Sequence, residues 1–180
     1  MVTREARTLR RDVEVAAIPY GDRITLASGT NVFITQALGG SFTAMTDHGY
    51  LVRIEGKDAD AIGETPVLPP TAEEAAGRST RELAWEQLKT CFDPEIPVNI
   101  VDLGLVYKCE AEPVEGGDRV KVEFTLTAPG CGIGDFLRQD VQQKLMALPG
   151  VKEAEVQVVL DPPWDQSMMS DAARLQLGLM

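Results

Sequence analysis

The chain has 180 residues, of which 44% are hydrophobic and 25% are charged, close to the average of soluble globular proteins. These values argue against intrinsic disorder, and no apolar run approaches the roughly 18 residues that a membrane span needs. The first residues are charged and lack an apolar core. We therefore expect a cytoplasmic protein with no secretory signal and no membrane partner.

Acidic residues outnumber basic ones. The 28 acidic and 17 basic residues give a net charge of -11. Residues 1–70 hold 7 basic and 9 acidic residues, whereas the remainder holds 10 and 19, so the acidity belongs to the C-terminal part. A charge of this sign repels phosphate backbones and anionic lipid, and we expect no nucleic-acid partner.

The chain contains three cysteines and one histidine. An odd number of cysteines in a cytoplasmic chain argues against a disulfide framework. No CxxC pair occurs, and a closed structural metal site needs about four ligands, more than one chain of this composition offers at suitable spacing. One chain could still supply a single thiolate to a shared site.

The N-terminal third consists of short apolar-rich runs separated by turn signals, with no helical period. This pattern predicts a small β-rich, barrel-like domain over residues 1–62. The expected strands are 12–18, 23–27, 31–37, 41–46 and 50–55.

A proline-containing stretch interrupts this pattern. Residues 63–77 include three prolines and no periodic apolar positions, which favours an extended spacer. We therefore predict a linker at residues 63–78 and a second domain at residues 79–180.

The second domain alternates helical and strand patterns. Ser79 followed by Glu82 matches a capping box, and the helix is expected to end before Pro94. A short tail helix is expected from about Ser170. The order α-β-β-α-β predicts a two-layer α/β sandwich, and the whole chain is assigned to the α+β class. The remaining predicted elements are strands at 100–109, 119–127 and 151–160 and a helix at about 133–148, with an acidic loop at 115–118.

Cys131 lies between Gly130 and Gly132, at the expected junction of a strand and a helix. Backbone N–H groups at a helix start are unpaired and partially positive, and they favour the thiolate that binds metal or attacks electrophiles. The alternative is a small turn residue that fills a gap. Cys91 and Cys109 fall on apolar faces of their elements, where a free cysteine packs as a small hydrophobe.

A second motif, DPEIPVNIVDLGLVY, covers residues 93–107. Its carboxylates Asp93, Glu95 and Asp102 could gather near Cys131 as hard oxygen ligands or as an acidic patch that faces a partner. The alternative is ordinary loop solvation, with Asp93 accepting backbone hydrogen bonds in a turn. The chain has no phosphate-binding loop motif, which argues against ATP-driven chemistry.

The segment DPEIPVNIVDLGLVY followed by TAPGCG resembles the family of iron–sulfur assembly factors that includes SufT, PaaD and the eukaryotic cytosolic iron–sulfur targeting factors. The resemblance covers roughly residues 79–175, and the N-terminal part looks like the extension found on SufT proteins. It implies a role in iron–sulfur protein maturation, with Cys131 as the cofactor-binding and metal-binding residue. The other residues that match the family motifs, carried over as a candidate surface and not as ligands, are Asp93, Glu95, Asp102, Thr127 and Pro129.

Three functions fit these residues. The first is a non-enzymatic carrier or adaptor between the iron–sulfur assembly machinery and client apoproteins. The second is a thiol enzyme with Cys131 as nucleophile or redox centre, and the third is a protein-interaction adaptor in which Cys131 binds no metal. The lack of a nearby histidine, the usual base for such a nucleophile, favours the first. One thiolate is too few for a cluster, so we expect a homodimer that holds an iron–sulfur cluster transiently.

Overall fold

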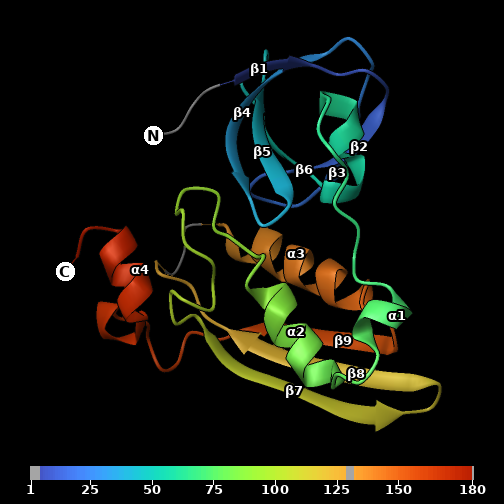
Figure 1. The fold of residues 1–180 in the computed structure, drawn as a ribbon. Coiled ribbons are helices and arrows are strands. Elements are labelled where there is room, and N and C mark those ends of the chain that lie inside the picture. The colour runs from blue at the N-terminus through green and yellow to red at the C-terminus, as the bar shows by residue number, and fades with distance from the viewer. Residues whose placement is uncertain (1–4, 129–131, 180) are drawn as a thin grey trace. The chain divides into compact units, whose positions relative to one another are not determined.

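The structure, a computed structural model, describes residues 5–128 and 132–179 (Figure 1). The chain divides into two units, Met1–Leu68 and Pro69–Met180. The first unit is built from strands and a 3-10 turn, and the second combines helices with a smaller sheet, so the chain has the mixed α+β content that the sequence predicts. Each helix within the described ranges is too short or too polar to cross a membrane.

A six-stranded antiparallel sheet makes up most of the first unit, in the order β1-β4-β5-β6-β2-β3 (Figure 1). Alternate residues of its strands enter a core, as Val13 and Val15 of β2 and Val32 and Ile34 of β4 do. The unit is therefore β-rich, as predicted. Its elements are β1 (Glu5–Thr8), β2 (Val13–Ala17), β3 (Arg23–Leu26), β4 (Asn31–Leu38), β5 (Ser41–Thr46), β6 (Leu51–Ile54) and the 3-10 turn η1 (Gly56–Ile62).

Strand β1 is the one strand of this sheet that the sequence pattern does not predict. Its residues EART contain no apolar alternation, and none of them is buried. The strand stands at one end of the sheet order and pairs with β4, where Glu5 lies opposite Ile34. Backbone pairing along an existing strand, rather than burial of its own side chains, therefore accounts for β1.

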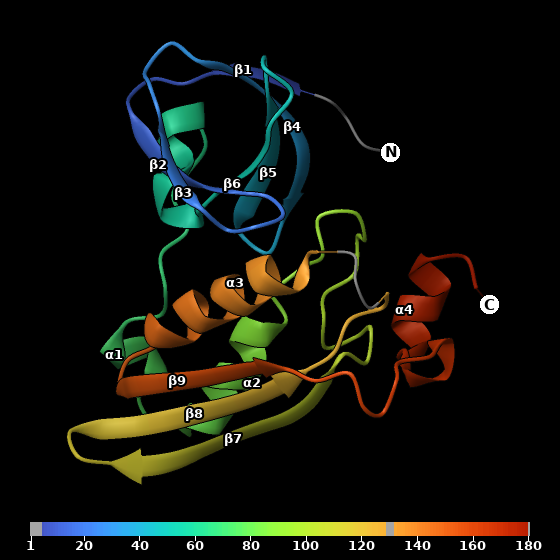
Figure 2. The same cartoon turned by 180° about the vertical axis from the view of Figure 1, so that it is seen from behind.

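In the second unit, helices α2 and α3 lie on the same side of a three-stranded sheet (Figures 1 and 2). Strand β8 is central, antiparallel to β7 and parallel to β9. Leu88 of α2, Leu137 of α3 and Phe124 of β8 are completely buried between the two layers. The elements are α1 (Ala72–Ala75), α2 (Thr80–Leu88), β7 (Val106–Val114), β8 (Gly117–Phe124), α3 (Gly134–Met146), β9 (Val151–Val158), the 3-10 turn η2 (Gln166–Met168) and α4 (Asp171–Gln176).

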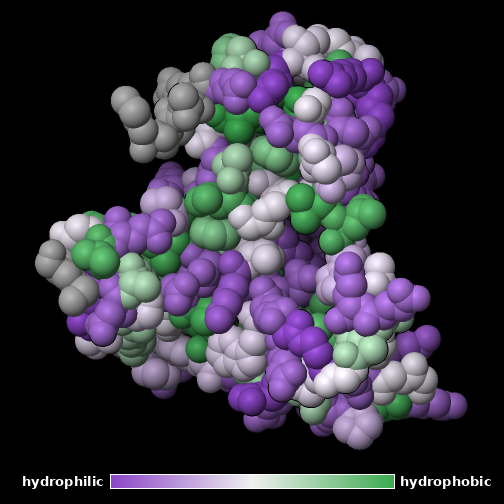
Figure 3. Space-filling view, viewed as in Figure 1, coloured by the Kyte–Doolittle hydropathy of each residue, from purple (hydrophilic) through white to green (hydrophobic). Residues whose placement is uncertain are grey.

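The other face of this sheet carries charged side chains. Arg119 of β8 bonds to Glu112 of β7 at 3.0 Å and to Glu153 of β9 at 2.6 Å. Lys121 lies 3.2 Å from the same Glu112. Hydrophilic residues are spread over the visible face of the second unit (Figure 3), in keeping with its acidic composition.

The strand predicted at 100–109 is wrong in its first half. Residues 101–104 form turns, and β7 begins only at Val106. The Asn99 side chain accepts the backbone N–H of Asp102 at 2.9 Å, and the N–H of Leu103 donates to the Asn99 carbonyl at 3.0 Å. Gly104 then ends the turn with φ of 79°. These local hydrogen bonds hold residues 101–104 in turns although their apolar residues alternate as in a strand. Leu103 is buried within the turn, so burial of its side chain does not require a strand here.

The end of α2 and the linker also differ from the prediction. Helix α2 begins as expected, with the Ser79 hydroxyl accepting the N–H of Glu82 at 3.1 Å, but it ends at Leu88, well before Asp93. The Thr90 hydroxyl donates to the carbonyl of Gln87 at 2.6 Å and occupies an acceptor of the last turn. The predicted linker also contains the four-residue helix α1.

The acidic loop predicted at 115–118 is shorter than expected. Val114 and Gly117 already pair as the last residues of β7 and the first of β8. Only Glu115 and Gly116 therefore remain as the turn, and Gly116 supplies the positive φ of 85° that the turn needs.

Candidate functional site

Three segments meet at the end of β8. The backbone N–H of Thr125, just after β8, donates to the carbonyl of Leu105 at 2.8 Å. On the other side, the N–H of Val159 donates to the carbonyl of Phe124 at 2.8 Å. The end of β8 is thus hydrogen-bonded on one side to the segment that precedes β7 and on the other side to the residue that follows β9. The first motif is therefore paired, at Leu105 and Thr125, with the strand end that leads to the second motif.

Helix α3 begins against this same strand end. A Cβ added at Gly134 would lie 3.2 Å from the Leu126 side chain, so the first turn packs closely on it. Gly132 has φ of 78° and precedes the N-cap residue Ile133. Among the described residues, no side chain caps this helix start. Backbone N–H groups at the start of a helix can donate to an anion or a thiolate.

Of the three candidate residues Thr127, Pro129 and Cys131, Thr127 falls within the described ranges, and it is half-buried. Pro129 and Cys131 lie outside them. The role assigned to Cys131 on sequence grounds therefore stays a prediction.

The first two motif carboxylates lie on a turn. The Asp93 side chain accepts the backbone N–H of Glu95 at 2.9 Å, and the Asp93 carbonyl accepts the N–H of Ile96 at 3.2 Å. Asp93 is half-buried, and Glu95 is exposed. Asp93 thus has the turn-forming role that the sequence allowed as the alternative to a ligand.

The third motif carboxylate, Asp102, is held by its neighbours. One of its oxygens accepts the side-chain N–H of Asn99 at 2.7 Å, and the other lies 3.4 Å from the Ser170 hydroxyl. Within residues 5–128 and 132–179, no three Asp, Glu, His or Cys side chains lie close enough to hold a metal ion. The three motif carboxylates therefore do not form a metal site by themselves.

Comparison with known proteins identifies this half of the chain. Residues 81–158 match the model of a family described as iron–sulfur cluster assembly protein. An "Fe-S protein maturation auxiliary factor" from Porphyromonas gingivalis is 42% identical over 102 residues, which cover 56% of this chain and 93% of that relative. The chain belongs to the iron–sulfur cluster assembly protein family. The match spans the segment at 93–105, the end of β8 and all of α3, so the family region includes the whole meeting point described above.

Two further relatives agree with this assignment. The "Fe-S protein maturation auxiliary factor SufT" of Staphylococcus aureus is 39% identical over 88 residues, covering 49% of this chain and 97% of that relative. A crystal structure of a domain of unknown function from Bacillus anthracis has 35% identity and a TM-score of 0.51, and covers 56% of this chain and 93% of the other. The six-stranded first unit lies outside the residues that the family model matches.

The other two cysteines of this iron–sulfur cluster assembly family member are core residues, as predicted. Cys91 is completely buried, and its thiol lies 3.6 Å from the carbonyl oxygen of Gln87. Cys109 is 4% exposed, and burial raises its pKa to about 11. Neither position favours the thiolate that a cluster requires.

Sequence reasoning missed the tail as a neighbour of the family motif. The indole N–H of Trp164 donates to the carbonyl of Leu103 at 2.7 Å, and the N–H of Ser170 donates to the carbonyl of Asp102 at 2.8 Å. The signals in the sequence are a tryptophan, Trp164, in the tail and a glycine, Gly104, inside an apolar run. A tryptophan that packs against the protein usually needs an acceptor for its N–H group. A glycine inside an apolar run often marks a bend or a close approach of another backbone.

Proposed function

We propose that this protein is a non-enzymatic iron–sulfur protein maturation factor that carries a cluster to client apoproteins through the thiolate of Cys131. The observation that carries the proposal is the family match over residues 81–158, together with relatives named as maturation factors. The cluster is cargo here and not a resident cofactor.

The distribution of the cysteines supports this choice of residue. Cys91 and Cys109 fill the core, and the high pKa of Cys109 keeps its thiol protonated at neutral pH. Cys131 immediately precedes Gly132 and the uncapped start of α3, whose N–H groups favour a thiolate. A ligand set of one thiolate per chain would leave coordination positions open, which suits transfer and not storage.

The remaining ligands must come from outside one chain. A homodimer with two Cys131 residues near its two-fold axis would supply two thiolates, and small thiols or the client would supply the others. The residues from 69 onward hold 10 basic and 19 acidic side chains, a charge that would attract basic surfaces on protein partners and repel nucleic acid.

The experiment is anaerobic reconstitution of the whole chain with iron and sulfide. Wild type is expected to bind a labile cluster, Cys131→Ala to bind none, and Cys109→Ala to bind as wild type does. Visible absorbance and iron content measure the binding, and light scattering before and after reconstitution measures the oligomeric state.

Three outcomes would contradict parts of the proposal. Unchanged binding in Cys131→Ala would remove the site assignment, and a protein that is monomeric in both states would remove the two-chain site. No binding in wild type, with client enzymes under-matured in cells that produce Cys131→Ala, would favour an adaptor whose cysteine contacts its partner.

A further inference from the structure

The C-terminal segment of the second unit, residues 161–177, is hydrogen-bonded to the family motif at residues 93–107. Besides the bonds of Trp164 to Leu103 and of Ser170 to Asp102, the side-chain amide of Gln176 donates to the carbonyl of Pro97 at 2.6 Å. The Tyr107 hydroxyl of β7 donates to the carbonyl of Pro162 at 2.8 Å. These bonds reach the motif segment between Pro97 and Tyr107.

Apolar burial anchors the same segment. Met169 is 8% exposed and Ala173 is 1% exposed, although both follow a stretch of exposed residues at 160–163. The tail also forms its own short elements, since the Ser170 hydroxyl accepts the N–H of Ala173 at 3.1 Å and starts α4. The tail is therefore a folded part of the second unit.

Gly104 allows the closest approach between the two segments. A Cβ added at Gly104 would overlap the backbone carbonyl of Met168, so the tail backbone occupies the space that any side chain would need. The φ of 79° at Gly104 independently favours glycine. The turn at 101–104 and the tail at 168 thus fit together only with glycine at this position.

The contacts of the tail reach the point where the first motif pairs with the end of β8. Leu105 follows Gly104 directly, and its carbonyl accepts the N–H of Thr125, two residues before Thr127. A tail that fixes residues 97–104 therefore also fixes the backbone against which the end of β8 is paired. The residues that the family model matches stop at 158, before any of these tail contacts.

We infer that the tail, residues 161–177, is a working part of this site: it positions the motif segment 93–105 and, through Leu105, the strand end that leads to Thr127. The positioning residues are Gly104 of the motif segment and Trp164 of the tail. The step from positioning to cluster handling rests on the proposed function, whereas the positioning itself does not.

The test compares two glycine substitutions in the full chain. Gly104→Ala strains a positive φ and displaces the tail. Gly150→Ala strains a similar φ of 82° but meets nothing within 4 Å, so it is the matched control. Hydrogen exchange followed by mass spectrometry is expected to show peptides from 93–105 and 161–177 exchanging about tenfold faster or more in Gly104→Ala, and at the wild-type rate in Gly150→Ala.

A spectroscopic measurement separates positioning of the site from general stability. After anaerobic reconstitution with iron and sulfide, the visible circular dichroism of the cluster is expected to change in Gly104→Ala and to stay as wild type in Gly150→Ala. If Gly104→Ala fails to fold, Trp164→Phe, which removes one N–H donor from the tail, is expected to show the same changes at smaller size.

Each result is decisive. Exchange at 93–105 that is equal in Gly104→Ala and Gly150→Ala would overturn the inference. Faster exchange with an unchanged cluster spectrum would also overturn it, because the tail would then act on stability alone. Failure of wild type to bind a cluster would count against the proposed function, and the exchange comparison would still decide whether the tail positions the motif.

Discussion

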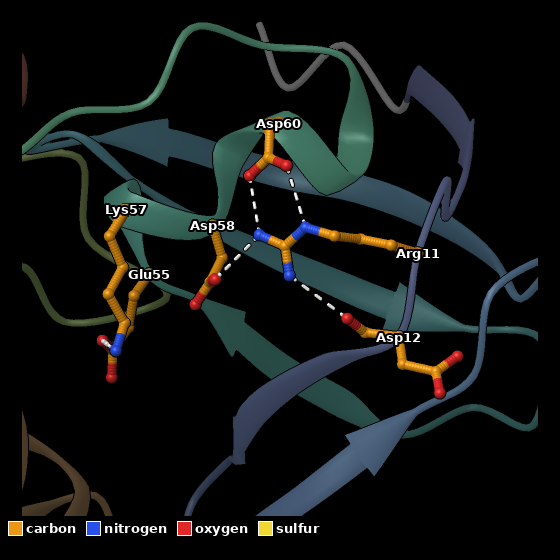
Figure 4. Close-up of polar contacts among 6 residues, drawn as sticks. All are labelled: Arg11, Asp12, Glu55, Lys57, Asp58 and Asp60. Atoms are coloured by element: carbon orange, nitrogen blue, oxygen red, sulfur yellow. Dashed lines mark hydrogen bonds and ion pairs between the residues drawn. The ribbon is translucent and has the colours of Figure 1, made fainter.

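Each unit has a segment that packs beside its main sheet, and the two segments are attached by different kinds of contact. They are the 3-10 helix η1 in the first unit and the tail, residues 161–177, in the second. In the first unit, the 3-10 helix η1 is held by an ionic cluster in addition to its buried residues Ala59, Ala61 and Ile62. The Arg11 guanidinium bonds to both oxygens of Asp60 at 2.8 and 2.7 Å and to Asp58 at 2.9 Å (Figure 4). The side chains of Arg11 and Asp60 are 42% and 49% exposed, so water and salt surround this cluster.

In the second unit, the tail is held mostly by neutral groups. The donors are an indole, a backbone amide and a side-chain amide, and their acceptors are the backbone carbonyls of Leu103, Asp102 and Pro97. Packing of Met169 and the close approach at Gly104 add to these bonds. The ionic contacts of η1 should therefore respond to salt and pH, whereas the contacts of the tail should respond to side-chain shape.

The largest expected effect is preferential cleavage by a protease in the segment that connects the two units. Limited digestion with a protease of broad specificity should cut first between Gly63 and Gly77, where exposed residues and three prolines connect the units. Mass spectrometry should then find two fragments, each keeping its own attachment. An early cut inside 100–160, with the 63–77 segment intact, would contradict this division of the chain.

Trp164→Phe is expected to have the next largest effect. Loss of one N–H···O=C bond and of some ring contact should lower the free energy of unfolding of the second unit by about 1 kcal/mol, equally at low and high salt. Chemical denaturation followed by circular dichroism measures this difference, and Trp85→Phe, at the other tryptophan of the chain, is the control for ring size. A loss that shrinks as salt rises would show that the tail is held by charge after all.

Asp60→Asn is expected to have the smallest effect. The bond from Arg11 lowers the pKa of the Asp60 carboxyl, so its contribution to stability is present above the unfolded-state pKa and fades as pH falls through the lower folded-state value. Hydrogen exchange of peptide 55–64 should be faster in Asp60→Asn than in wild type at pH 7 and low salt.

This difference should shrink in high salt, and it should also shrink as pH falls below about 4 toward the lower pKa of the folded-state Asp60 carboxyl. Asp47→Asn makes the same charge change in an exposed turn and should leave peptide 55–64 as in wild type. A difference for Asp60→Asn that persists at high salt and low pH would mean that the ion pair is not what holds η1.

Local patterns were enough to predict most elements. The strands of the first unit after β1 follow from apolar alternation between glycine-containing turns, and Ser79 marks the start of α2 as a helix cap. Such signals act within a few residues, so the sequence contains them directly. The core positions of Cys91 and Cys109 follow for the same reason.

The site was harder to predict because its contacts are distant in sequence. Residues 101–104 alternate like a strand, but the Asn99 side chain and Gly104 turn them into a compact loop. The partner of Leu103 is Trp164, about sixty residues away, and no local pattern indicates that pairing. For Cys131, family resemblance and the predicted helix start remain the basis of its assignment.

The two edges of the three-stranded sheet carry residues that oppose pairing with another chain. Strands β7 and β9 are the sheet's two edges, and an exposed edge can recruit an extended segment of another chain as an added strand. Here Glu110 and the exposed Pro113 lie on one edge, and Glu153 and Glu155 lie on the other. These residues discourage strand addition and aggregation along both sides of the sheet.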